Sequence, residues 1–150
     1  MATVEVTFTP LPAHVRTARL VATAVARRSG VDESLLDEVR LAVGEACSRA
    51  VEAHRRHCPR EPIRVELTDH EERFEVVVTD AALRPGGPGR SAGSGPAGTG
   101  PLPADLQLPE GVGLAVIAGL ADDVRISPAG VGISVRMSWK RHAGSETSLR

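Results

Sequence analysis

The chain has 150 residues, of which 41% are hydrophobic, and this is enough for one domain with a single buried core. It contains two Phe, one Trp and no Tyr, so the core must be aliphatic and little aromatic surface remains for stacking nucleic-acid bases. The formal net charge is −1, with acidic and basic residues intermixed. This pattern argues against direct binding to nucleic acid or to an anionic membrane.

The sequence also bears on location and on metal or disulfide chemistry. The N-terminus lacks a basic region followed by an apolar stretch, and no segment approaches the length that spans a bilayer. Cys47 and Cys58 have neither metal-ligand spacing nor the partners of a disulfide framework. Cys47 lies among small apolar residues, which favours a reduced core thiol over a nucleophile. We therefore expect a cytoplasmic protein without a protein-built metal site.

The first 60 residues predict one strand and two helices. Residues 3–9 alternate between apolar and polar side chains, as in a half-buried strand, and two prolines end this segment. A helix with an apolar face is predicted over residues 14–28. Asp32 is a suitable N-cap for a longer helix with a broad apolar stripe, which runs to about His57.

A long segment poor in apolar residues separates two predicted strand pairs. Residues 63–69 and 74–80 flank a polar turn and predict an antiparallel hairpin. Residues 84–104 consist mainly of Gly, Pro, Ser and Ala, which bury too little apolar area to offset the entropy of ordering them. We expect a flexible, lid-like loop there.

The remaining residues predict a helix and a closing hairpin. Residues 114–120 form an apolar helical segment, and residues 123–127 and 131–139 are read as two strands. The polar tail, residues 142–150, is expected to be disordered. Helices grouped against hairpin strands indicate an α+β fold, a two-layer sandwich whose mostly antiparallel sheet is covered by helices on one face.

Two segments carry a resemblance to a known family. They are LDEVRLAVGEAC, residues 36–47, and EGVGLAVIAGLADDV, residues 110–124. Over roughly residues 3–140 the chain resembles the anti-sigma-factor serine/threonine kinases of the histidine-kinase-like ATPase superfamily, common in spore-forming and filamentous bacteria. The resemblance implies a domain of that type over residues 1–141, with ATP and magnesium as cofactors. It also implies a sigma factor and an anti-sigma-factor antagonist as partners, and it makes a homodimer plausible.

The long helix shows the most informative departure from this family. Family members carry a Glu that acts as general base, matched here by Glu45, and four residues later an Asn that ligates magnesium. Arg49 occupies the Asn position, and a guanidinium has no lone pair to offer a metal. From the residues alone, Glu45 and Arg49 are also an i,i+4 pair toward the polar side of the apolar stripe, worth about 0.2–0.5 kcal/mol. The structural and the catalytic interpretation both stay open.

Three further positions correspond to the family's nucleotide site, and two of them are substituted. Asp80 matches an Asp that binds the adenine amino group, although it can equally be a polar strand end. Ala82 replaces a Gly that lets the base approach the backbone. Ile133 replaces a Thr whose hydroxyl faces the nucleotide, which suggests a drier, filled pocket.

A glycine turn gives the best match to the family. Gly111 and Gly113 are expected immediately before a helix, where free N–H groups suit a phosphate, although tight packing alone can also require glycine there.

The scaffold motifs are retained while several ligand positions are altered. The leading prediction is therefore an anti-sigma-factor-like regulatory protein that acts by protein–protein binding, with weakened or lost ATP binding and kinase activity. One alternative is an active serine/threonine kinase that phosphorylates an anti-sigma-factor antagonist, in which Glu45 is the base. The other is a nucleotide-binding sensor without turnover.

Overall fold

The computed structural model describes residues 2–82 and 110–141, with side chains from residue 114 onward in the second range. The predictions made for the 84–104 loop and for the 142–150 tail lie outside these residues.

Five strands form one antiparallel sheet. They are β1 (Ala2–Phe8), β2 (Ile63–Asp69), β3 (Arg73–Thr79), β4 (Asp123–Ala129) and β5 (Gly132–Lys140). The order across the sheet is β1-β2-β3-β5-β4, and all four pairings of neighbours are antiparallel. Both predicted hairpins, β2–β3 and β4–β5, are present. Because β5 lies between β3 and β4, it brings the C-terminal hairpin against the end of β3.

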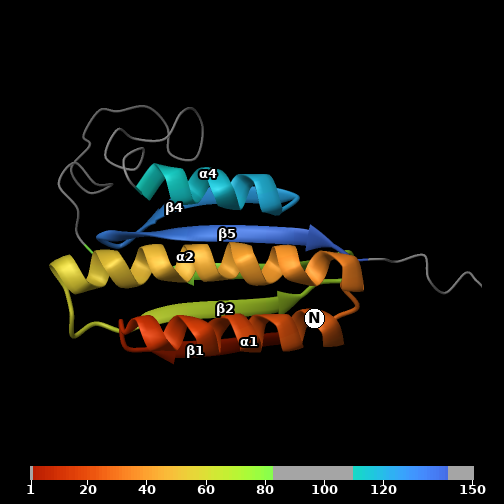
Figure 1. Cartoon of the computed structure of the whole chain (residues 1–150), viewed down its shortest axis with the longest axis horizontal. Coiled ribbons are helices and arrows are strands. Elements are labelled where there is room, and N and C mark those ends of the chain that lie inside the picture. The colour runs from red at the N-terminus through yellow and green to blue at the C-terminus, as the bar shows by residue number, and fades with distance from the viewer. Residues whose placement is uncertain (1, 83–109, 142–150) are drawn as a thin grey trace, which may run out of the picture.

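Three α-helices cover one face of this sheet. They are α1 (Pro12–Arg28), α2 (Leu36–His57) and α4 (Glu110–Leu120), and Figure 1 shows them side by side with α2 in the middle. Gly30 follows α1 with φ of 90°, a conformation that favours glycine, and so ends the helix. The predicted α+β two-layer fold is confirmed.

The start of the second helix differs from the prediction. The carboxylate of Asp32 accepts a hydrogen bond from the backbone N–H of Ser34 at 2.9 Å, as a cap does. It caps a single 3-10 turn, η1 (Glu33–Leu35), and the α-helix α2 begins after that turn.

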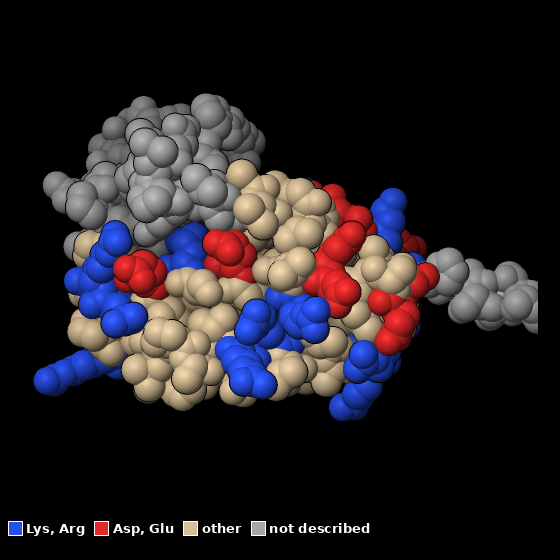
Figure 2. Space-filling model, in the orientation of Figure 1, with Lys and Arg blue, Asp and Glu red and all other residues tan. Residues whose placement is uncertain are grey.

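Figure 2 shows acidic and basic side chains interspersed over the helix face of the molecule.

The core lies between the sheet and the helices, because alternate strand residues point toward the helices. On β3 the inward residues include Phe74 and Val76, and both are fully buried. Trp139 of β5 is also fully buried, and its indole N–H donates to the carbonyl oxygen of Leu120 at 2.9 Å. This bond ties the end of α4 to the sheet. None of the helices in the described ranges is long and apolar enough to cross a membrane.

Candidate functional site: a buried ion pair at the end of β3

The apolar stripe of α2 contains one buried cation. Small side chains such as Ala46 and Ala50 let α2 lie close to the sheet, and both are fully buried. Arg49 lies between them in the sequence and is only 5% exposed. The prediction that Arg49 lies toward the polar side of the apolar stripe is therefore wrong. Its long side chain reaches across the core layer to the sheet.

The partner of Arg49 is Asp80, which directly follows β3. One guanidinium nitrogen, Nη2, lies 3.0 Å from Asp80 Oδ2, and the two side chains are 2% and 0% exposed. The second carboxylate oxygen, Oδ1, accepts backbone N–H bonds from Ala82 at 3.1 Å and from Ile133 at 3.4 Å. The carboxylate therefore has a cation on one oxygen and two backbone donors on the other, as a buried charge requires.

Strand β5 holds the Asp80 backbone in place. The Asp80 N–H donates to the carbonyl oxygen of Ile133 at 3.0 Å, so the β3–β5 pairing continues past the end of β3. A Cβ atom placed on Gly132 would overlap the carbonyl and carboxylate oxygens of Asp80. Only glycine permits this close approach, so Gly132 is a required part of the site.

A second helix side chain, which sequence reasoning did not assign to the site, supports the same segment. His54 of α2 is fully buried, and its Nε2 accepts the backbone N–H of Ala81 at 2.9 Å. Its Nδ1 lies 2.9 Å from the carbonyl oxygen of Glu61, so it must be the nitrogen that carries the hydrogen. No local pattern in the sequence indicates this role, because the N–H group that His54 accepts is 27 residues away along the chain. His54 and Arg49 together fix residues 80–82 against α2.

The two aliphatic substitutions fill the space beside the ion pair. Ala82 is fully buried, and Ile133 is 2% exposed and belongs to the hydrophobic core. An apolar surrounding lowers the local dielectric constant and strengthens a charge–charge contact within it. The structure thus brings four predicted site residues together: Arg49, Asp80, Ala82 and Ile133.

Glu45 lies on a different part of α2. It is partly exposed and lines a groove of about 400 Å³ between α1 and α2, together with Arg19 and Ser48. Arg49, four residues later, turns toward the sheet and forms its buried contact with Asp80. The ion pair formed by Arg49 thus joins α2 to the sheet, and differs from the i,i+4 pair with Glu45 that was one of the two interpretations left open by the sequence.

Gly111 and Gly113 were expected just before the third helix, but α4 begins at Glu110 and contains both in its first turn. The prediction of a glycine turn outside the helix is therefore wrong. The first N–H groups of a helix lack partners within it, so an anion site at this place would lie at the N-terminus of α4 itself.

The charge of Arg49 also acts on a nearby thiol. Burial raises the pKa of Cys47 to about 12, and the positive charge of Arg49 partly opposes this shift. Cys47 is fully buried and has no disulfide, as predicted, and a thiol with a raised pKa is a poor nucleophile.

Residues 8–139 match the family described as histidine kinase-like ATPase domain, and the chain belongs to this family. It is similar to the crystal structure of the RsbU and RsbW domains of Rv1364c from Mycobacterium tuberculosis, with a TM-score of 0.64 and 17% identity. That match covers 94% of this chain and 33% of the other, so this chain spans about a third of the other's length.

A second solved structure is the catalytic domain of histidine kinase ThkA, with a TM-score of 0.44, 12% identity, and coverage of 94% of this chain and 97% of that one. No curated protein matches the chain. At such low identity, the likeness to the Mycobacterium tuberculosis protein shows a common fold.

Proposed function

We propose that this protein is an anti-sigma-factor-like regulator that acts by protein–protein binding, and that the Arg49–Asp80 ion pair closes its nucleotide position. The fold supports the first part, because it is shared with a chain that contains an RsbW domain. A sigma factor, an anti-sigma-factor antagonist, or both would be the partners.

The observation that carries the second part is the buried contact of 3.0 Å between Arg49 and Asp80. An adenine amino group would have to displace the guanidinium to reach this carboxylate. Opening a buried ion pair costs about 3–5 kcal/mol, and 3 kcal/mol alone lowers an affinity more than a hundredfold. Most of the binding free energy of a weak ligand would be lost in this way.

The residues present also do not fit the magnesium that the family uses. The Asn position is held by Arg49, which has no lone pair and adds a positive charge where a cation would have to bind. Ile133 offers no hydroxyl, and its side chain is packed in the core. Phosphoryl transfer assisted by magnesium is therefore not part of the proposed function.

Calorimetry tests the closed nucleotide position. Wild-type protein titrated with ATP or ADP, with and without magnesium, is expected to show no binding tighter than millimolar. Magnesium-dependent binding at micromolar concentrations would contradict the proposal. Binding without turnover would favour the sensor, and phosphate transfer to an antagonist protein would favour the kinase.

Variants make the same test more specific. Arg49→Asn should not recover full binding, because Ala82 and Ile133 remain. The triple variant Arg49→Asn/Ala82→Gly/Ile133→Thr should bind magnesium–ATP more tightly than any of the single variants. Arg56→Asn is the matched control, since Arg56 is on the same helix with a side chain 57% exposed. It should leave the titration unchanged.

The protein-binding part needs its own assay. Complex formation with each sigma factor of the source cell should be measured with and without magnesium–ATP. An affinity that is unaffected by nucleotide supports the proposal, whereas strict dependence on ATP would contradict it.

A further inference from the structure

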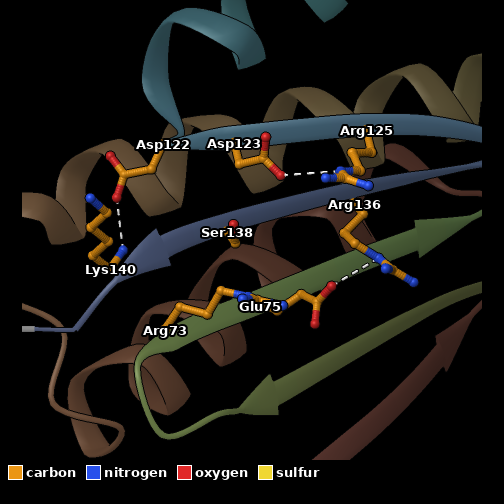
Figure 3. Close-up of a pocket in the computed structure, with 8 residues that line it drawn as sticks. All are labelled: Arg73, Glu75, Asp122, Asp123, Arg125, Arg136, Ser138 and Lys140. Atoms are coloured by element: carbon orange, nitrogen blue, oxygen red, sulfur yellow. Dashed lines mark hydrogen bonds and ion pairs between the residues drawn. The ribbon is translucent and has the colours of Figure 1, made fainter. Parts of the chain in front are cut away.

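The sheet face opposite the helices carries a polar pocket of about 390 Å³, which Figure 3 shows from that side. Its shape follows from strand register. Lys140 of β5 lies opposite Arg73 of β3, and two residues earlier on β5 Ser138 lies between Glu75 of β3 and Asp123 of β4. In the next outward row, Arg136 pairs with Arg125. Long charged side chains thus surround the short side chain of Ser138.

Each carboxylate of this pocket already has at least one contact with a basic side chain or a backbone N–H group. Glu75 is contacted by Arg136 Nε at 2.8 Å and by His70 Nε2 at 2.6 Å. Asp123 is contacted by Arg125 Nε at 3.4 Å. The third acid, Asp122, accepts the backbone N–H of Lys140 at 2.7 Å. Four cationic and three acidic side chains line the pocket in all, which leaves an excess of positive charge.

That excess lies at Arg73 and Lys140. Both side chains are exposed, and neither forms an ion pair with any residue in the described ranges. The register places them directly opposite each other on neighbouring strands, where two like charges repel. An anion between them would remove this repulsion.

Ser138 adds a polar group between these charged side chains. The residue is only 6% exposed and lines the pocket. A hydroxyl at this position can donate a hydrogen bond to an anion that binds in the pocket. Figure 3 shows Ser138 on β5, with Asp123 on one side of it and Glu75 on the other.

We propose that this pocket binds an acidic side chain of a protein partner, with the carboxylate accepting hydrogen bonds from Arg73, Lys140 and the Ser138 hydroxyl. Charged donors of this kind form the strongest hydrogen bonds to carboxylates. A run of nucleic-acid phosphates fits poorly, because three acidic side chains lie in the same pocket and no aromatic side chain lines it for stacking. The inference rests on the proposed protein-binding function and adds a second contact surface, on the opposite side of the sheet from the helices.

Nuclear magnetic resonance on the full ¹⁵N-labelled chain tests this inference. The probe is a blocked pentapeptide with the central sequence Asp-Glu-Asp, compared with the same peptide carrying Asn-Gln-Asn. We expect saturable shifts at the amides of Arg73, Ser138 and Lys140 with the acidic peptide alone. Arg73→Gln and Lys140→Gln should each weaken binding roughly two- to fivefold, as expected for exposed ion pairs. Ser138→Ala should also weaken it.

Arg64→Gln is the matched control. Arg64 is an exposed arginine on the same sheet face, lies outside the pocket, and contacts Glu5 at 3.8 Å. This variant removes the same charge and should keep wild-type peptide affinity. An equal loss in the control would mean that net charge alone attracts the peptide, and would overturn the proposal.

Other results would overturn it as well. Equal shifts with the neutral peptide, or tighter binding of a single-stranded oligonucleotide, would exclude a carboxylate site for a protein. If a chain that ends at residue 141 bound the peptide much more tightly, the pocket would be occupied by residues 142–150 of the chain itself. It would then not be a site for a protein partner. Absence of peptide binding would refute only this inference, whereas micromolar ATP binding would refute only the closed nucleotide position.

Discussion

Removing the charge of Arg49 tests the buried ion pair directly. Arg49→Met keeps a long apolar side chain but removes the cation that contacts Asp80 Oδ2 at 3.0 Å. The carboxylate keeps the N–H groups of Ala82 and Ile133, yet its side chain is 0% exposed and water cannot replace the guanidinium. Breaking one side of such a pair costs about 3–5 kcal/mol, a large share of the 5–15 kcal/mol by which domains are stable.

A double-mutant cycle separates the pair from other effects of the substitution. Asp80→Asn alone leaves the guanidinium buried without its carboxylate, and it should also be strongly destabilising. Arg49→Met/Asp80→Asn removes both charges, so it should be less destabilised than the sum of the single variants by up to about 3 kcal/mol. Urea unfolding followed by the fluorescence of Trp139, which is fully buried, measures all four proteins.

The control is Arg56→Met on the same helix. Arg56 contacts Glu52 at 3.3 Å with both side chains more than half exposed, and such pairs contribute at most about 1 kcal/mol. If Arg49→Met cost no more than this control, or if the two single substitutions were additive, the ion pair would not be buried in solution. The Arg49–Asp80 pair would then not close the nucleotide position.

Four further substitutions test other features of the fold. Gly132→Ala should destabilise the protein by about 1–3 kcal/mol because its Cβ overlaps the buried aspartate. Gly119→Ala on α4, where a Cβ has open space, should instead stabilise it by up to about 1 kcal/mol in the same unfolding assay. His54→Leu should cost about 2 kcal/mol and speed hydrogen exchange at the amide of Ala81, since that N–H loses its acceptor. A slow exchange rate in the variant would show that the histidine is dispensable. Because the pKa of Cys47 is raised in the folded state, stability should fall as pH rises from about 9 to 12, by up to about 1.4 kcal/mol per pH unit. Cys47→Ala should reduce this slope, and an unchanged slope would refute the assignment.

Most of the fold could be predicted from hydrophobic periodicity. Residues 63–67 of β2 alternate between apolar and polar side chains, since one sheet face packs against helices and the other does not. Both β2 and β3 lie within a residue of the prediction. The start of α4 was missed because glycine lowers helix propensity by about 1 kcal/mol per residue. Tertiary packing can override this preference, and α4 lies against α2.

The candidate site was less predictable, because its central contact joins residues far apart in the chain. Periodicity placed Arg49 at the border of an apolar stripe, where an arginine normally extends into solvent. Nothing local indicates that its partner is 31 residues away at the end of a strand. The same holds for His54, whose acceptor role depends on where the backbone N–H of Ala81 lies. The resemblance to a family singled out both Arg49 and Asp80, but it did not predict the contact between them.

The substituted positions make physical sense as one set. A buried arginine at position 49 would be very unfavourable without the carboxylate of Asp80, and that carboxylate would be equally unfavourable among apolar neighbours without the arginine. Ala82 and Ile133 exclude water from the pair and so strengthen the attraction within it. Changing Arg49 alone to Asn therefore leaves the Asp80 carboxylate buried among apolar neighbours without the cation that neutralises its charge. This coupling is the reason that recovery of nucleotide binding should need all three reversions together, and that each single reversion should lower stability more than it raises affinity.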